Sequence, residues 1–256
     1  MSERVLEVEH LAKRFGGVKA VDDVTFDVVR GEFLGIIGPN GSGKTTLVNL
    51  ITGFIRANQG KIVFKGKDIT KKMPFTIANL GIVRSFQMVK PFYQLPAFKN
   101  VVVALRSPRV MKQVRGGKYY ERDDVAIDLL EDVGFERDSF VPFKLAASLP
   151  HGYLKRMELA RCMALRPEIY IFDELFSGMS LTEVASTVPI LEKLKDQGST
   201  VIIIEHRLKE LFRVADRILV MNFGQKIAEE TPEKILDNQE VKKAYLGTEI
   251  EMVVKR

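Results

Sequence analysis

Residues 38–46 form a complete G-x-x-x-x-G-K-[ST] loop, with the sequence Gly38-Pro39-Asn40-Gly41-Ser42-Gly43-Lys44-Thr45-Thr46. The apolar run at residues 32–37 suits a buried strand, and apolar residues return at helical spacing over residues 46–53. In such a strand–loop–helix unit, glycines let backbone N–H groups turn inward around phosphate oxygens. The N-terminus of the helix adds a partial positive charge. The motif therefore predicts a nucleoside triphosphate site in an α/β fold.

Two side chains of the loop have expected roles of their own. Lys44 is expected to reach the β- and γ-phosphates, and the Thr45 hydroxyl is expected to ligate Mg²⁺. The sequence thus predicts a nucleoside triphosphate and Mg²⁺ as bound groups.

The composition is that of an ordinary globular protein. A chain of 256 residues can form one large domain or a core with an inserted subdomain. No apolar run approaches the roughly 18–20 residues that span a bilayer, and the first residues lack the pattern of a signal peptide. The lone Cys162 fits a reducing cytoplasm and a packing role. The formal charge of +6 comes from scattered basic residues, which suits a solvated surface.

The apolar patterns divide the chain. Residues 5–9, 24–28 and 61–64, the last followed by a turn at Gly66, predict a small antiparallel sheet. Continuous apolar runs at residues 169–172 and 201–204 suit strands of a parallel sheet covered by helices on both faces. Residues 181–195 predict a helix that ends at Gly198.

The middle of the chain is rich in helical pattern, including residues 123–133 and 150–165. Residues 106–120 carry Pro, Gly and basic residues, which predicts an exposed, mobile connection. We therefore expect a P-loop NTPase (RecA-like) core with an antiparallel β subdomain, formed by residues 1–87 and 167–256. A helical subdomain at residues 88–166 is inserted into it.

Acidic residues follow the apolar run at residues 169–172. Asp173 and Glu174 are expected at the carboxyl end of a strand, where ligands bind in α/β sheets. Asp173 is placed to hold Mg²⁺, and Glu174 to orient or deprotonate the water that attacks the γ-phosphate. Acidic pairs also occur on ordinary surfaces, so the assignment depends on the phosphate loop.

Two further polar residues end strand-like runs. His206 can hydrogen-bond to the γ-phosphate, although a lone histidine there also suits a cap for the next element. The amide oxygen of Gln87 can ligate Mg²⁺ or hold the water, although a surface glutamine is the usual default.

Together these motifs resemble the nucleotide-binding (ATPase) subunit of ABC transporters, over nearly the whole chain. The order fits: phosphate loop, Gln87, a signature region at residues 149–153, Asp173-Glu174, then His206. The resemblance implies that Phe15 stacks on adenine, a contact that uses the π face of the ring. An N-K-x-D guanine motif is absent from the sequence.

Residues 81–87, 204–208, 221–229 and 244–247 resemble the larger ATPase subunit of branched-chain amino-acid importers. That resemblance implies permease subunits, a second ATPase in a homo- or heterodimer and, indirectly, an extracytoplasmic solute-binding protein. It implies a cytoplasmic subunit, peripheral on the inner face of the cell membrane. Residues 88–96, which mix aromatic, apolar and proline residues, would help to receive a permease helix, although ordinary loop packing is the alternative.

The signature region departs from the family pattern, Leu-Ser-Gly-Gly-Gln, which contacts the nucleotide held by the opposite subunit. Here it reads Leu149-Pro150-His151-Gly152-Tyr153. Pro150 has neither a hydroxyl nor an N–H. Losing a hydrogen bond to a charged group costs about 1.5–3 kcal/mol, which predicts a composite site slowed by roughly 10–100-fold rather than abolished.

Two smaller departures follow Glu174. Leu175 replaces a usual proline, and Ser180 replaces a usual aspartate, so a fixed negative charge is missing and communication between the two sites is expected to change. Because Lys44, Asp173, Glu174 and His206 are all present, we favour a hydrolysing importer subunit. The alternatives are a regulatory ATP-binding subunit with weak or no hydrolysis, and a soluble cassette ATPase that acts on nucleic acid or ribosomes. No nucleic acid is expected as a partner.

Overall fold

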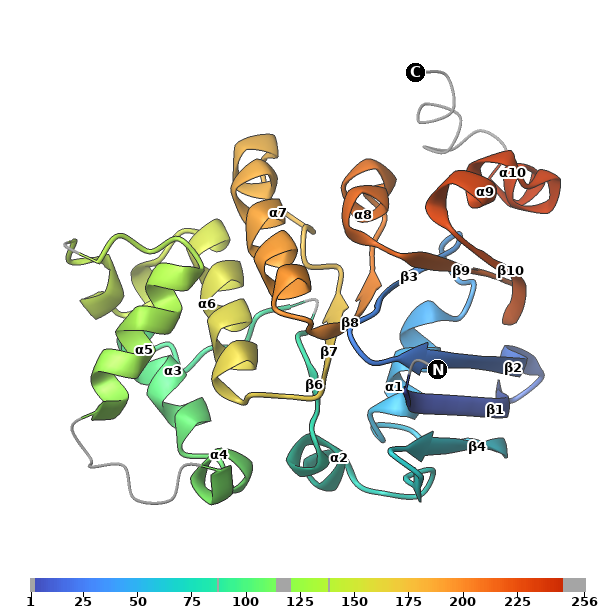
Figure 1. The fold of residues 1–256 in the computed structure, drawn as a ribbon, viewed down its shortest axis with the longest axis horizontal. Helices are drawn as coiled ribbons and strands as arrows, with labels where there is room; N and C mark the ends of the chain where they lie inside the picture. The colour runs from blue at the N-terminus through green and yellow to red at the C-terminus, as the bar shows by residue number, and fades with distance from the viewer. Residues whose placement is uncertain (1–2, 87, 114–120, 138, 246–256) are drawn as a thin grey trace.

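A computed structural model describes residues 3–86, 88–113, 121–137 and 139–245. A six-stranded sheet runs through its centre in the order β10-β9-β3-β8-β7-β6 (Figure 1). Neighbouring strands from β9 to β6 are parallel, and β10 pairs antiparallel with β9 at the edge. The strands are β3 (Phe33–Ile37), β6 (Ile82–Arg84), β7 (Ile169–Asp173), β8 (Thr200–Ile204), β9 (Arg217–Asn222) and β10 (Gln225–Glu230). The parallel strands expected at residues 169–172 and 201–204 are confirmed as β7 and β8.

A second, antiparallel sheet has the order β2-β1-β4-β5. It contains β1 (Arg4–Phe15), β2 (Val18–Val29), β4 (Gln59–Phe64) and β5 (Lys67–Asp68). Gly66, with a positive φ of 73°, lies in the turn that joins β4 to β5. The small antiparallel sheet predicted from the sequence is confirmed.

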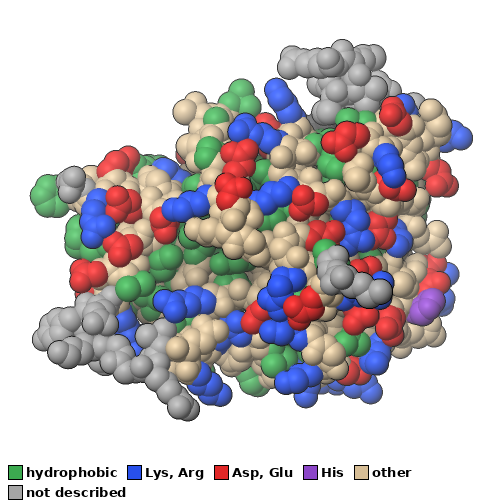
Figure 2. All heavy atoms as spheres, viewed as in Figure 1, with side chains coloured by type: hydrophobic (Ala, Val, Ile, Leu, Met, Phe, Trp, Pro, Cys, Tyr) green, Lys and Arg blue, Asp and Glu red, His purple; other side chains and the backbone are tan. Residues whose placement is uncertain are grey.

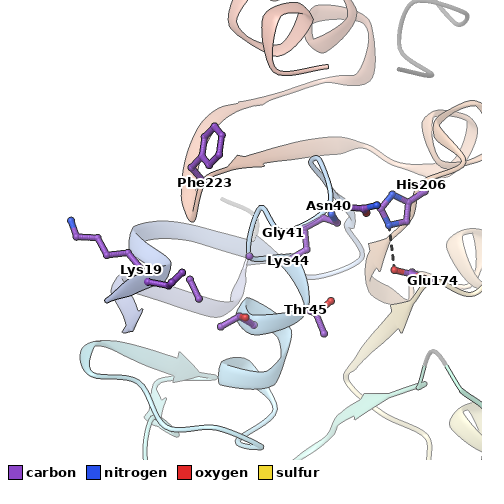
Figure 3. Close-up of a pocket in the computed structure, with 12 residues that line it drawn as sticks. Lys19, Asn40, Gly41, Lys44, Thr45, Glu174, His206 and Phe223 are labelled. Carbon is purple, nitrogen blue, oxygen red and sulfur yellow. Dashed lines mark hydrogen bonds and ion pairs between the residues drawn. The ribbon is translucent and has the colours of Figure 1, made fainter. Parts of the chain in front are cut away.

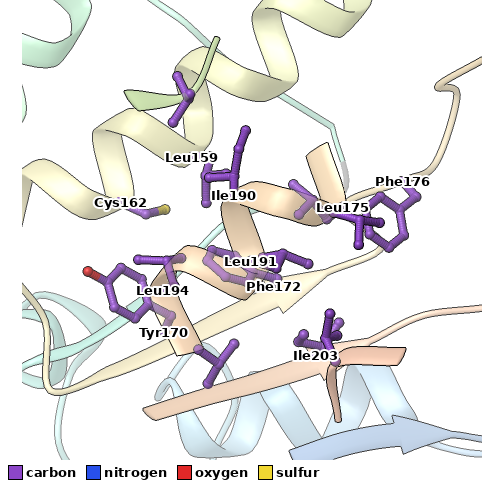
Figure 4. Packing of buried hydrophobic residues seen from close by; sticks show 14 of the residues in the cluster. Leu159, Cys162, Tyr170, Phe172, Leu175, Phe176, Ile190, Leu191, Leu194 and Ile203 are labelled. Carbon is purple, nitrogen blue, oxygen red and sulfur yellow. The ribbon is translucent and has the colours of Figure 1, made fainter. Parts of the chain in front are cut away.

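The central sheet separates two apolar clusters because its buried strands alternate their side chains between faces. Phe33 and Ile37 of β3 belong to one cluster, whereas Leu34 and Ile36 belong to the other. Figure 4 shows the first cluster, where Tyr170 and Phe172 of β7 lie under helix α7 (Leu181–Asp196). The second cluster includes apolar side chains of helix α1 (Lys44–Ile51) and the antiparallel sheet.

The remaining helices fall into two groups. At one end, away from the antiparallel sheet, lie α3 (Ala97–Leu105), α4 (Pro108–Gln113), α5 (Glu121–Asp132) and α6 (His151–Ala164) (Figure 1). Two 3₁₀ turns, Val141–Phe143 and Ala146–Ser148, lead into α6. The others are α2 (Pro74–Leu80), α8 (Leu208–Val214), α9 (Pro232–Asp237) and α10 (Gln239–Ala244). No helix among the described residues is long and apolar enough to cross a membrane.

The expectation of a mobile connection at residues 106–120 is wrong for its first half. Residues 108–113 form α4, with Val110 buried. The Arg109 guanidinium donates to the carbonyl oxygen of Leu80 at 2.8 Å and to that of Arg166 at 3.1 Å. Arg109, a basic residue that the sequence analysis expected in solvent, therefore links α4 to the backbone at Leu80 and at Arg166. Residues 114–120 lie outside the described part of the chain.

Candidate active site

The phosphate-binding loop joins β3 to α1, as predicted. Two of its glycines are required for steric reasons. Gly43 precedes the helix with a φ of 104°, in the left-handed region that favours glycine. A Cβ at Gly43 would lie 2.2 Å from the carbonyl oxygen of Ala20, and one at Gly38 would lie 2.2 Å from that of Met221. The loop is thus packed so closely on its neighbours that these two positions have no room for a side chain.

The Lys44 side chain is buried within this loop. Its Nζ donates to the carbonyl oxygens of Gly38 at 2.7 Å and Pro39 at 3.0 Å. Burial lowers the pKa of Lys44, and the Glu174 and Asp173 carboxylates counteract this shift. The Ser42 hydroxyl is buried and has no hydrogen-bond partner among the described residues. A buried cation and an unpartnered hydroxyl in one loop fit an anionic, hydrogen-bonding ligand.

A pocket of about 340 Å³ opens beside the loop (Figure 3). Three segments line it besides the loop: β2 near its start, the ends of two central strands, and the turn between β9 and β10. The lining residues are Val18, Lys19, Ala20, Asn40, Gly41, Gly43, Lys44, Thr45, Thr46, Glu174, His206 and Phe223.

Two exposed phenylalanines bear on the predicted adenine contact. Phe15, the predicted adenine contact, is 51% exposed at the end of β1 with Lys13 Nζ 5.1 Å from its ring centroid, and it is not among the lining residues. Phe223 does line the pocket and is 86% exposed. Its turn is held against the loop because Gly224 N–H donates to the Ser42 carbonyl oxygen at 3.0 Å. The sequence signal for Phe223 is an aromatic residue before a turn glycine.

The acidic edge forms where neighbouring parallel strands end together. Asp173 is the last residue of β7 and pairs in register with Ile204 of β8. Glu174 and His206 follow these strands, and Glu174 Oε1 lies 3.2 Å from His206 Nε2 (Figure 3). Two residues 32 positions apart in the chain therefore meet in the lining of the pocket.

Asp173 has a partner that the sequence did not reveal. Arg84, at the end of β6, donates from Nη2 to Asp173 Oδ2 and from Nη1 to Asn49 Oδ1, each at 2.5 Å. The Arg84 and Asp173 side chains are 7% and 3% exposed, so the ion pair is buried. No sequence motif identifies Arg84, because its partners lie on α1 and β7 and are close to it only in the folded chain.

The donors near the loop fit a Mg²⁺ ion bound together with phosphates. Mg²⁺ prefers oxygen ligands and takes only one or two from the protein, with phosphates and water completing its shell. The Thr45 hydroxyl and the Asp173 carboxylate are such oxygens. Among the described residues, no group of three or more His, Cys, Asp or Glu side chains could hold a metal alone. Gln87, the third predicted ligand, lies outside the described residues.

Comparison with known proteins decides the family. Residues 21–177 match the model of the family described as ABC transporter. The chain belongs to the ABC transporter family. As such it is an ATP-hydrolysing transport subunit, and its fold is that of an ABC ATPase cassette.

Relatives of this ABC subunit match it over nearly its whole length. A probable branched-chain amino acid transport ATP-binding protein, LivG of Archaeoglobus fulgidus, is 36% identical over 96% of both chains. The high-affinity branched-chain amino acid transport ATP-binding protein BraF of Pseudomonas aeruginosa is 36% identical, covering 96% of this chain and 99% of its own. The crystal structure of the ADP conformation of MJ1267, an ATP-binding cassette of an ABC transporter, has a TM-score of 0.83 at 33% identity, covering 96% and 100%.

The signature region of this ABC subunit lies at the start of α6. Leu149 is buried, and Pro150 is the N-cap, which forms no side-chain cap. His151, Gly152 and Tyr153 form the first helical turn, whose N–H groups have no partner within a helix. A Cβ at Gly152 would lie 1.9 Å from Glu183 Oε1, so a side chain at this position would displace the Glu183 carboxylate. None of these five residues lines the 340 Å³ pocket of the same chain.

Ser180 has a structural role that its sequence position did not show. It is the N-cap of α7, where its hydroxyl accepts from the Glu183 N–H at 3.2 Å and its own N–H donates to Glu183 Oε2 at 2.8 Å. This reciprocal pair is a capping box. Serine, aspartate and asparagine are similarly good N-caps, so the exchange at this position keeps the helix start while it removes a charge.

Proposed function

We propose that this chain is the ATPase subunit of a membrane importer for branched-chain amino acids or a related small solute. The full-length likeness to two branched-chain amino acid transport ATP-binding proteins supports the solute class. The observation that carries the proposed hydrolytic site is the Glu174–His206 pair, 3.2 Å apart beside the phosphate loop.

The residues of the proposed site have different roles in ATP binding and hydrolysis. Backbone N–H groups of residues 38–46 and the Lys44 ammonium hold the phosphates. Glu174 orients the attacking water and accepts its proton, while His206 holds Glu174 and contacts the γ-phosphate. Phe15 stacks on adenine.

We assign the metal site to Thr45, Gln87 and Asp173. A Mg²⁺ ion bound there with the phosphates would neutralise charge that develops during phosphoryl transfer. The oxygen donors of Thr45 and Asp173 beside the phosphate loop support this assignment.

We propose that two such subunits, identical or not, close around two nucleotides. Residues Leu149, Pro150, His151, Gly152 and Tyr153 of one would contact the nucleotide of the other. The uncapped start of α6 supports this, because free N–H groups at a helix N-terminus favour an anion. Residues 88–166 would form the helical subdomain that moves with this segment, against a core of residues 1–87 and 167–256.

The permease is proposed to dock near residues 88–96, which places the subunit on the cytoplasmic face of the membrane. Exposed apolar side chains support this site: Met88 is 72%, Phe92 49% and Tyr93 50% exposed, and Phe54 and Phe86 are half exposed beside each other. Exposed large apolar side chains are expected on a protein-binding surface. An extracytoplasmic solute-binding protein would act on the permease from the other side.

Membrane fractionation tests this assignment. Deleting the cytoplasmic permease helix should release the subunit into the soluble fraction, whereas unchanged membrane association would count against the importer proposal. Neighbouring coding sequences for a permease, a solute-binding protein and a second ATPase would give independent support.

The regulatory alternative rests on Pro150 and predicts a different result. In the reconstituted complex, Glu174→Gln in this chain alone should strongly reduce ATP turnover if this subunit hydrolyses ATP. Unaffected turnover would favour a regulatory subunit.

A nucleic-acid partner is not expected, because basic and acidic side chains are interspersed on the face shown in Figure 2. RNA or DNA binding that weakens steeply with salt would revive that alternative.

A further inference from the structure

The backbone at Glu174 adopts an uncommon conformation. Its φ is 51°, in the left-handed region that a non-glycine residue rarely occupies. Such strain persists only where the surroundings fix it, and it is concentrated at functional sites. Both polar groups of the Glu174 backbone are held. Its N–H donates to the Ile204 carbonyl oxygen at 2.9 Å. Its carbonyl oxygen accepts from the Ser177 N–H at 3.1 Å, within the same loop, and from Lys155 Nζ at 3.2 Å, from outside that loop.

Lys155 reaches this carbonyl from another part of the fold. It lies on α6, one turn after Pro150, and is only 2% exposed. Burial lowers its pKa, and the Glu205, Glu174, Glu158 and Asp173 carboxylates oppose that shift. A lysine without a partner would be unfavourable at such a depth, so its ammonium depends on these neighbours.

Glu205 also holds the loop that contains Glu174. It follows β8, is 3% exposed, and accepts from the Phe176 N–H at Oε1 (2.8 Å) and the His206 N–H at Oε2 (3.3 Å). One carboxylate thus joins the backbone two residues after Glu174 to the backbone of His206. It connects the two loops whose side chains form the 3.2 Å pair.

We propose that Lys155 and Glu205 are positioning residues that hold the Glu174 backbone in its left-handed conformation and keep Glu174 facing His206. Neither touches the reacting atoms. Because Lys155 belongs to α6, it also ties the Glu174 loop to the helix whose first turn carries the signature residues. A displacement of α6 is then transmitted to the proposed catalytic carboxylate through the Lys155–Glu174 hydrogen bond. The inference rests on the proposed role of Glu174.

The first test compares variants of the purified full chain. Lys155→Met keeps the length of the side chain and removes the donor, whereas Lys155→Arg keeps a donor. We expect Lys155→Met to lower kcat by about 10–100-fold, the loss typical of a misplaced catalytic group, while ATP affinity measured with a fluorescent analogue changes less than about two-fold. Amide hydrogen exchange over residues 173–178 should become faster, and Lys155→Arg should recover part of both properties.

Two further variants separate the possible failures. Lys209→Met removes one exposed lysine from α8 and should leave kcat and exchange unchanged. Glu205→Ala, which removes the acceptor for Phe176, should reproduce the exchange and kcat changes without any change at Lys155. If either variant fails to fold, the other still tests the network.

The results that overturn the proposal are specific. The proposal is overturned if kcat and amide hydrogen exchange over residues 173–178 are both unchanged in Lys155→Met or in Glu205→Ala. Equal losses of kcat and ATP affinity without recovery in Lys155→Arg would also overturn it, since that outcome indicates a merely structural role. Glu174→Gln tests the underlying assignment separately. If it keeps normal turnover, the proposed role of Glu174 fails, whatever Lys155 does.

Discussion

Arg84 Nη2 and Asp173 Oδ2 are 2.5 Å apart in a buried ion pair that joins the ends of strands β6 and β7. Removing one partner of such a pair leaves an uncompensated charge in the interior, which typically costs about 3–5 kcal/mol. We therefore expect Arg84→Met to lower the free energy of unfolding by that amount, measured by urea denaturation. Arg84→Lys should lose less stability than Arg84→Met, because it keeps the positive charge beside Asp173. It should still be less stable than the parent chain, because lysine cannot contact Asp173 and Asn49 with two separate nitrogen atoms.

A surface pair provides the control for Arg84. Arg137 contacts Asp128 and Glu131, and all three side chains are about half exposed. Exposed ion pairs contribute roughly 0–1 kcal/mol, so Arg137→Met should change the free energy of unfolding little. Similar losses in the two variants would show that burial of the Arg84 pair has no energetic consequence.

The phosphate loop predicts a difference between two glycines with positive φ. Gly43→Ala would force a Cβ to 2.2 Å from the Ala20 carbonyl oxygen, whereas a Cβ at Gly66 would meet nothing within 4 Å. Both substitutions have the cost of left-handed backbone, about 1–2 kcal/mol. Only Gly43→Ala should also weaken ATP binding, by at least about 10-fold or 1.4 kcal/mol, in calorimetric titration. Equal ATP affinities would contradict the close packing of the loop.

The two exposed aromatic residues near the pocket make opposite predictions for adenine. Base stacking contributes about 1–3 kcal/mol, so Phe15→Ala should weaken ATP binding by roughly 5–150-fold and leave inorganic triphosphate binding unchanged. Phe223→Ala is the matched variant, at an aromatic residue that does line the pocket. If Phe223→Ala shows the selective loss of ATP and Phe15→Ala does not, the adenine contact belongs to Phe223.

Glu205 predicts how stability depends on pH. Burial raises its pKa from 4.5 to about 7, Glu174 adds to the shift, and Lys155 and two backbone N–H groups oppose it. Between these values the folded chain keeps a proton that the unfolded chain has lost, so this residue makes stability fall as pH rises. The unfavourable contribution is absent below about pH 4.5 and complete above about pH 7, where it is on the order of 3 kcal/mol.

Glu205→Gln removes that titration. The difference in free energy of unfolding between Glu205→Gln and the parent chain should therefore shift in favour of the variant between pH 4.5 and pH 8. Urea denaturation of both proteins in the same buffers measures it. A difference that stays constant over this range would contradict the raised pKa.

Pro150 predicts a gain of function. Pro150→Ser supplies an N-cap hydroxyl that α6 lacks, which should stabilise the chain by about 1 kcal/mol. If the same hydroxyl reaches the nucleotide of the partner subunit, turnover of the complex should rise by roughly 10–100-fold. A rise in thermal stability without a rise in turnover would limit the role of Pro150 to the helix start.

The sequence predicted those parts of the protein that depend on local pattern. Buried runs marked β7 and β8, and polar residues just after them marked the edge where Glu174 and His206 meet, because parallel strands share a carboxyl end. The roles of these residues remain predictions, and Gln87 lies outside the described structure.

The partners of buried charges could not be predicted in the same way. Arg84, Lys155 and Glu205 contact residues 19 to 89 positions away in the chain. From the sequence alone a charged residue is expected at the surface, because its burial depends on contacts that form only on folding. The same reason explains Arg109 and α4, which the local composition of residues 106–120 assigned to a mobile connection.

The capping box at Ser180 has a consequence for the history of this position. Serine, aspartate and asparagine can start α7 about equally well, so exchange among them leaves the stability of the folded chain almost unchanged. A carboxylate at this position can therefore be lost in one step, while the loop that presented it stays in place. Duplicated subunits in a heteromeric pair could diverge in activity at this residue without any intermediate that fails to fold.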